Sequence, residues 1–156
     1  MLPGRVYLAV RFGFSGPFFG FSTWASSLMV NDDLPTFPDV ASVARGFTAL
    51  CLAGEFYAAG EKYWADDVVS IEPYPQADDP DAVCRGIEAV RARNQRWFST
   101  HAIEDLSVDG PFITGDHFAL FADMLIVHAG RRTPHSHIAV FAVREGKIIE
   151  ERYFHP

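Results

Sequence analysis

Trp64-Ala65-Asp66-Asp67-Val68-Val69-Ser70-Ile71-Glu72-Pro73 is the stretch that decides the fold of this chain. It runs from the end of an apolar helical pattern, through an acidic turn at residues 66–67, into a short β-rich run. That run ends in one carboxylate, Glu72, directly in front of a proline. A carboxylate at the end of a buried strand is costly unless it is paired or protonated. Glu72 is therefore a candidate general base, with a solvent-facing residue or a partner of Arg85 as the alternatives.

A helix is expected upstream of this stretch, capped by Asp39 and ending near Trp64. Its apolar positions recur at close to helical spacing, at Val43, Phe47, Leu50, Cys51, Gly54 and Tyr57. Downstream, residues 73–85 are expected to form a proline-rich loop, and Gly86 opens a second helix with Trp97 on its apolar side.

Strand patterns fill the rest of the chain. A strand beginning at 103–108, interrupted at 109–111, is expected before strands at 117–128 and 132–143. A tight turn at Glu145-Gly146 then leads into a last strand at 147–154. The order predicts an α+β domain in which helices cover one face of a curved antiparallel sheet.

This order, together with the WADDVVSIEP stretch and the closing VREGKIIEERYF, resembles the nuclear-transport-factor-two-like superfamily over about residues 39–155. SnoaL-like polyketide cyclases and ketosteroid isomerases belong to this superfamily. The resemblance implies a cone-shaped curved sheet wrapped around N-terminal helices, in a SnoaL-like domain at 39–156. It also implies that Glu72 occupies the position of the catalytic carboxylate. The fold hosts isomerases, cyclases, dehydratases and non-catalytic binders, so it does not specify the reaction.

Residues 1–38 differ from the rest of the chain and are expected to form a poorly structured N-terminal extension. The first 31 residues contain no acidic residue, and glycines interrupt their aromatic-rich pattern. One interpretation is a secretory signal, and another is an upstream extension of the reading frame with Met29 as the natural start. The second is favoured, because the glycines break the apolar core that a signal needs.

The composition limits the partners of this chain. With 156 residues, 49% of them hydrophobic and 21% charged, it is expected to form a globular domain with its own core. The net charge of −7 argues against nucleic acid as the partner. No run of eighteen apolar residues is present, so no membrane-spanning helix is expected. Cys51 and Cys84 lack CxxC spacing and a disulfide pattern, which favours reduced thiols and the cytoplasm.

Strand register predicts which side chains face the interior. A two-residue hairpin at Ala129-Gly130 places two sets on one face: Leu120, Ala122 and Met124, and His135, His137, Ala139 and Phe141. This face is expected to be concave and covered by the helices. The opposite face is unusually apolar for a surface that faces solvent. This pattern predicts a homodimer contact through Phe121, Leu125 and Val127.

The last hairpin has two possible registers. A three-residue turn at 144–146, with Gly146 in the left-handed conformation, adds to the histidine face Ile149, Glu151, Tyr153 and His155. A two-residue turn instead adds Ile148, Glu150, Arg152 and Phe154. The three-residue turn is favoured, and it places His137 opposite Tyr153.

The concave face is then expected to surround an apolar cavity for a small hydrophobic molecule. Glu72 is the candidate base, and His137 and Tyr153 are the candidate catalytic donors to a carbonyl. The candidate binding residues are His135, Glu151, Phe47, Trp97 and Tyr57. The resemblance aligns the oxyanion-hole tyrosine of ketosteroid isomerases with Phe47 and their protonated aspartate with Ala139. Steroid isomerase activity itself is therefore not expected.

Two functions remain open at this stage. One is a cofactor-independent acid–base isomerase, cyclase or dehydratase acting on a small hydrophobic carbonyl compound. The other is a non-catalytic module for ligand binding or dimerisation. A metal-dependent enzyme is a third alternative, because the imidazoles of His135 and His137 with Glu72 or Glu151 would make a set of two histidines and one carboxylate. This spacing is common by chance, however, so neither a metal nor another cofactor is expected.

Overall fold

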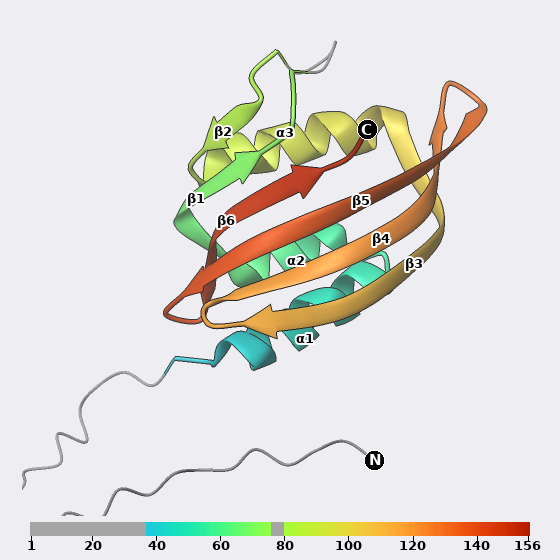
Figure 1. Ribbon diagram of the computed structural model, residues 1–156. Helices are drawn as coiled ribbons and strands as arrows, with labels where there is room; N and C mark the ends of the chain where they lie inside the picture. The colour runs from blue at the N-terminus through green and yellow to red at the C-terminus, as the bar shows by residue number, and fades with distance from the viewer. Residues whose placement is uncertain (1–36, 76–79) are drawn as a thin grey trace, which may run out of the picture. The chain divides into compact units, whose positions relative to one another are not determined.

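Three helices lie against one face of a curved sheet in this computed structural model, which describes residues 37–75 and 80–156 (Figure 1). The expected extension falls almost entirely on residues 1–36, which lie outside the described residues. The elements are, in order, α1 (Val40–Leu52), α2 (Phe56–Tyr63), β1 (Trp64–Ile71), β2 (Val83–Arg85), α3 (Ile87–Thr100), β3 (His101–Thr114), β4 (His117–His128), β5 (Arg131–Arg144) and β6 (Lys147–Phe154).

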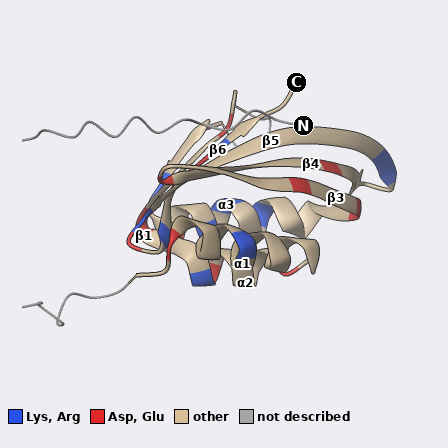
Figure 2. Ribbon diagram, turned by 60° about the horizontal axis from the view of Figure 1, so that its bottom comes forward, with Lys and Arg blue, Asp and Glu red and all other residues tan. Residues whose placement is uncertain are grey.

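The six strands form one sheet in the order β2-β1-β6-β5-β4-β3. Neighbouring strands are antiparallel except β1 and β6, which are parallel. Figure 2 shows the sheet as one layer and the three helices as a second layer beneath it. This arrangement confirms the predicted α+β fold, with helices on the concave face of the sheet. None of the helices in the described part of the chain is long and apolar enough to cross a membrane.

The single helix predicted from Asp39 to Trp64 is wrong, because the chain forms two helices there. Asp39 does cap α1, since its side chain accepts a hydrogen bond from the Ser42 amide at 2.7 Å. The helix ends at Leu52, and Gly54 follows with a φ of +76°, in the left-handed region that glycine adopts readily. The Glu55 amide donates to the Leu50 carbonyl and the Gly54 amide to the Cys51 carbonyl, which is the Schellman arrangement.

The predicted acidic turn at residues 66–67 is also wrong. Asp66 and Asp67 lie within β1, whose pairing with β6 is irregular between Trp64 and Val69. This irregularity lets two successive aspartates both face solvent, where Asp67 pairs with Arg144 at 2.8 Å. The predicted loop at 73–85 likewise includes β2, which pairs with the end of β1.

The hairpin between β4 and β5 has the predicted register. His128 pairs with Arg131 around the two-residue turn, so Leu120 pairs with Ala139 and Ala122 with His137. Phe118 and Phe141, on the same face, stack with ring centroids 4.6 Å apart beneath Phe47. The inner face of the sheet is therefore the one expected from the alternation of side chains.

The hairpin between β5 and β6 differs from both predicted registers. Its turn has two residues, because Arg144 pairs with Lys147, and Glu145 and Gly146 are both left-handed. A bulge at Ile149 then shifts the pairing by one residue, between the pair Val143–Ile148 and the pair Ala142–Glu150. The bulge buries Ile148 completely near the turn and still brings Glu151 and Tyr153 to the inner face. Tyr153 lies opposite Ala139, however, and not opposite His137 as predicted.

Candidate active site

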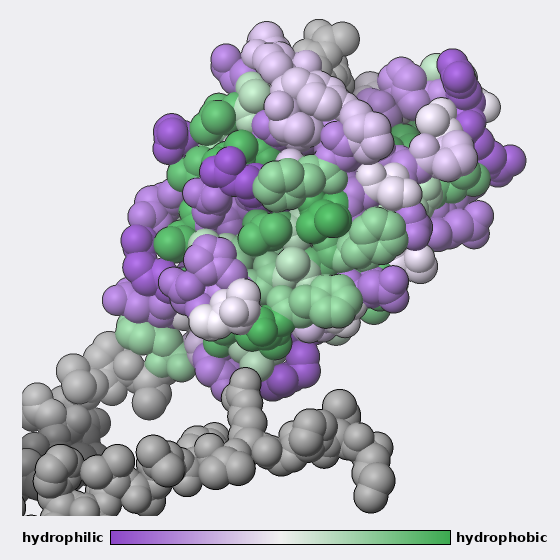
Figure 3. Space-filling view, in the orientation of Figure 1, coloured by the Kyte–Doolittle hydropathy of each residue, from purple (hydrophilic) through white to green (hydrophobic). Residues whose placement is uncertain are grey.

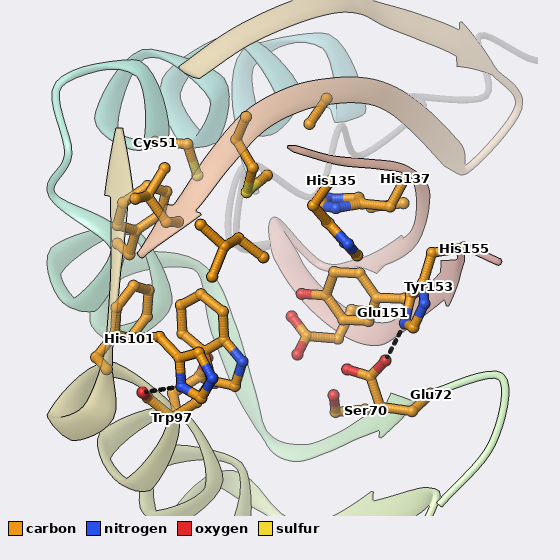
Figure 4. Close-up of a pocket in the computed structure, with 18 of the residues that line it drawn as sticks. Cys51, Ser70, Glu72, Trp97, His101, His135, His137, Glu151, Tyr153 and His155 are labelled. Atoms are coloured by element: carbon orange, nitrogen blue, oxygen red, sulfur yellow. Dashed lines mark hydrogen bonds and ion pairs between the residues drawn. The ribbon is translucent and has the colours of Figure 1, made fainter. Parts of the chain in front are cut away.

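A cavity of about 830 Å³ lies between the inner face of the sheet and the helices. The eight residues that the sequence suggested for a site all line it: Glu72, His137, Tyr153, His135, Glu151, Phe47, Trp97 and Tyr57. Among the described residues, only two of the lining side chains are acidic, Glu72 and Glu151. Figure 4 shows both of them at one end of the cavity, which we call the Glu72 end, with Trp97 and His101 on the opposite side.

Glu72 is held at the cavity wall by both its backbone and its side chain. It follows β1 directly, and its amide donates a hydrogen bond to the Ala82 carbonyl at 2.8 Å. Its Oε2 lies 3.1 Å from Nε2 of His155, and the two side chains are 20% and 9% exposed. The partner of Glu72 is thus His155. Neither alternative from the sequence, a side chain that faces solvent or a pair with Arg85, is observed. Because a carboxylate accepts, Nε2 of His155 carries the hydrogen of this bond.

His155 is the site residue that the sequence did not select. Its Nδ1 lies 3.1 Å from the Tyr74 hydroxyl oxygen, and the Tyr74 hydroxyl donates to the Pro156 carbonyl. These contacts fasten the C-terminal end of the chain over the segment after β1. The i, i+2 alternation of Glu151, Tyr153 and His155 already placed His155 on the inner face. The sequence carried no signal, however, that it pairs with a residue 83 positions away.

Glu151 is a buried carboxyl group in the wall of the cavity. Its residue is 1% exposed, and its Oε2 accepts a hydrogen bond from Nε1 of Trp64 at 2.9 Å. Burial raises the pKa of Glu151, against the lowering effect of the hydrogen bonds from Ser70 and Trp64. The nearby charge of Glu72 raises the pKa further. Glu151 is therefore placed to remain protonated where an exposed glutamate would be ionised.

Burial also favours the uncharged form of two imidazoles at this end, those of His135 and His137. Desolvation lowers the pKa of His137 to about 4, with help from His135 and His155. The pKa of His135 is lowered as well, first by desolvation and then by His155. The rings are neighbours, since the ring centroids of His135 and His137 are 5.5 Å apart and those of His135 and His155 are 5.1 Å apart. No group of three potential ligand side chains among the described residues has the geometry to hold a metal ion.

Tyr153 completes the Glu72 end with a phenol that stays protonated. Burial raises the pKa of Tyr153 well above its ordinary value, and the neighbouring Glu151 and Glu72 raise it further. Its ring meets that of His137 edge to face, with centroids 5.6 Å apart. The Glu72 end thus combines one carboxylate with neutral hydrogen-bond donors, Tyr153 and His137. This is a set of groups that can move a proton and stabilise the negative charge that results.

The remaining predicted residues lie away from Glu72. Phe47 on α1 is buried and packs against the inner-face ring of Phe141, with centroids 5.0 Å apart. Tyr57 on α2 and Trp97 on α3 both contact Phe98, with ring centroids 5.4 and 4.9 Å apart. These side chains build an aromatic wall rather than a second polar centre.

Comparisons with known proteins agree with this architecture. The crystal structure of a protein named as a SnoaL-like polyketide cyclase from Mesorhizobium loti is 36% identical in sequence. It superposes with a TM-score of 0.69, over 76% of this chain and 100% of that one. A protein of unknown function with a cystatin-like fold from Xanthomonas campestris is 19% identical. Its TM-score is 0.64, over 76% of this chain and 91% of that one.

A third solved structure, an LEH-like epoxide hydrolase from M. tuberculosis, shares the fold at 17% identity. Its TM-score is 0.57, over 73% of this chain and 82% of that one. A search of the curated proteins returned no match. The sequence profile of the SnoaL-like domain matches residues 39–155, the whole of the helices and sheet described above. This chain therefore belongs to the SnoaL-like domain family.

Proposed function

We propose that this protein is a cofactor-independent acid–base enzyme, an isomerase, cyclase or dehydratase, that acts on a small hydrophobic carbonyl compound. The observation that carries the proposal is the Glu72 carboxylate, fixed by His155 at 3.1 Å in the wall of a cavity that also presents the protonated Tyr153. A fixed carboxylate beside neutral donors is what removal of a proton next to a carbonyl requires.

In the proposed reaction, Glu72 takes a proton from the carbon next to the substrate carbonyl. The electron pair of the broken C–H bond moves onto the carbonyl oxygen, and Tyr153 and His137 stabilise the enolate by donating hydrogen bonds. Protonated Glu72 then returns its proton to another carbon of the substrate, to a carbonyl oxygen that the enolate carbon has attacked, or to a departing hydroxyl group. These three fates are isomerisation, cyclisation and dehydration.

The test uses proton exchange, because it needs no knowledge of the natural substrate. The purified protein is incubated in D₂O with a panel of cyclic enones and aromatic ketones, and NMR follows the loss of the protons next to the carbonyl. We expect at least one compound to exchange faster with the protein, and Glu72→Gln to slow this exchange about 10²- to 10⁴-fold.

Glu150→Gln is the matched control, because Glu150 is the neighbour of Glu151 that pairs with Arg152 instead of lining the cavity. The Glu150→Gln variant should catalyse the proton exchange at the wild-type rate. An unchanged rate in a folded Glu72→Gln variant would remove Glu72 as the base. Binding of the compounds without any exchange would instead favour the non-catalytic ligand-binding module.

The proposed setting of this activity is a homodimer in the cytoplasm. The outer face of the sheet, seen in Figure 3, carries a patch of apolar side chains, which includes Phe112, Ile138 and Phe154 at 61%, 46% and 49% exposure. Phe121 pairs with Ile138 in this patch, which supports contact between two copies through it. Sedimentation equilibrium should give twice the chain mass for the wild type and a smaller mass for Ile138→Lys. A monomeric wild type would exclude the dimer.

A further inference from the structure

We propose that the end of the cavity around Trp97 binds the anionic group of a planar, apolar organic acid. The proposal rests on the proposed function in one respect. It adds a charged group to the ligand that the same cavity would bind. It is carried by the side chains that line this end: Trp97, His101, His128 and Arg131.

Three rings form a stack here. The ring of His101 lies between those of Trp97 and His128, with centroids 4.7 and 4.3 Å away and planes within 9° and 22° of parallel. The stack continues into an aromatic wall, because Phe98 packs edge-on against Trp97 and stacks on Phe56 at 5.2 Å. Such a wall favours a flat, unsaturated ligand over a compact aliphatic one.

The two imidazoles of the stack are held in one tautomer. Nδ1 of His101 lies 3.0 Å from the Trp97 carbonyl oxygen, and Nδ1 of His128 lies 3.1 Å from that of Thr100. Because a carbonyl oxygen only accepts, Nδ1 carries the hydrogen in each ring. Nε2 of each ring is then the nitrogen that remains to contact a ligand.

Strand register adds an arginine to this pair. His101 pairs with His128, and His128 pairs with Arg131, so the three side chains form one row across β3, β4 and β5 on the inner face. No ion pair between Arg131 and a carboxylate occurs within the described ranges. The basic residues at the start of β5 are the blue segment in Figure 2 at the end of the sheet where β4 turns into β5.

The acidic side chains that line the cavity lie at one end of it. Glu72 and Glu151, the two acidic lining residues of the described chain, lie at the Glu72 end, together with the buried Arg93. Arg131 lines the cavity at the Trp97 end. The molecule as a whole has a net charge of −7, so this positive end is a local feature. An elongated ligand with its carbonyl at Glu72 would place a carboxylate, sulfonate or phosphate here.

A matched pair of fluorescent probes tests this inference. Anilinonaphthalene sulfonate is a planar apolar anion, and N-phenylnaphthylamine has the same rings without the sulfonate. Fluorescence titration of the full chain should give a dissociation constant about tenfold lower for the anion. Arg131→Gln should weaken binding of the anion about tenfold and leave the affinity for the neutral probe unchanged.

Arg132→Gln is the matched control, because it removes the same charge from the next residue, whose guanidinium pairs with Glu104 at 2.9 Å. It should leave the affinity for both probes unchanged.

Equal affinity for the two probes would overturn the proposal, and so would an equal loss in Arg131→Gln and Arg132→Gln or the failure of both probes to bind. None of these results bears on proton exchange by Glu72, so the proposed function stands or falls separately.

Discussion

The two ends of the cavity are held in different ways. At the Glu72 end, side chains from distant parts of the chain bind one another, as in the pair Glu72–His155 and the pair Trp64–Glu151. At the Trp97 end, the polar side chains instead bind backbone carbonyls at the end of α3, as His101 and His128 do.

This difference has an energetic consequence. Burial shifts the pKa of several side chains at the Glu72 end, where charged forms lose water and gain few compensating partners. The imidazoles of the Trp97 end keep a backbone partner and a stacked ring. We infer that the Glu72 end lowers the stability of the folded state, whereas the Trp97 end contributes to it.

The largest expected effect is the loss of folding stability at acidic pH that the protonation of His137 causes. Because the pKa of His137 is lowered from 6.5 to about 4, the unfolded state binds this proton first as the pH falls. Stability that is present above pH 6.5 is therefore lost between pH 6.5 and 4, by about 3 kcal/mol in total. His137→Asn should remove this part of the pH dependence in urea unfolding. A wild-type slope in the variant would contradict the assignment.

The next effect compares the tryptophans of the two ends. Trp64→Phe removes the hydrogen-bond donor of a buried carboxyl group and should lower the free energy of unfolding by about 1–3 kcal/mol from that bond. Trp97→Phe keeps a ring in the stack and should cost about 1 kcal/mol or less. Urea unfolding of both variants measures the difference. A larger loss in Trp97→Phe would reverse the comparison.

The smallest expected effect is a gain in folding stability when Glu151 is replaced by glutamine. The pKa of Glu151 is raised above its ordinary value of 4.5, so the stability that it contributes below that pH is lost as the pH rises through the folded-state pKa. Glu151→Gln does not titrate and can still accept from Trp64. It should therefore unfold at a higher urea concentration than the wild type at pH 8 and at the same concentration at pH 4. A less stable variant at pH 8 would show that Glu151 is ionised and well paired.

Local patterns were enough to predict much of the sheet. The hairpin between β4 and β5 follows from strict alternation and one short turn, and its inner face, including His135 and His137, was predicted correctly. The hairpin between β5 and β6 was not, because Ile148 and Ile149 are equally apolar and a bulge decides which of them is buried. The break at Gly54 was missed because the apolar helical period continues across it.

The sequence by itself determined the Asp39 cap of α1, the alternation of β4 and β5 and the side chains of these strands that face the interior, because these depend on neighbours in the chain. Only the tertiary structure decided that Glu72 binds His155, that Glu151 accepts from Trp64, and that the row from His101 to Arg131 is complete. The partners in the two buried pairs are 83 and 87 residues apart. The protonation of buried groups depends on how completely the surrounding chain excludes water, and that is a property of the folded molecule alone.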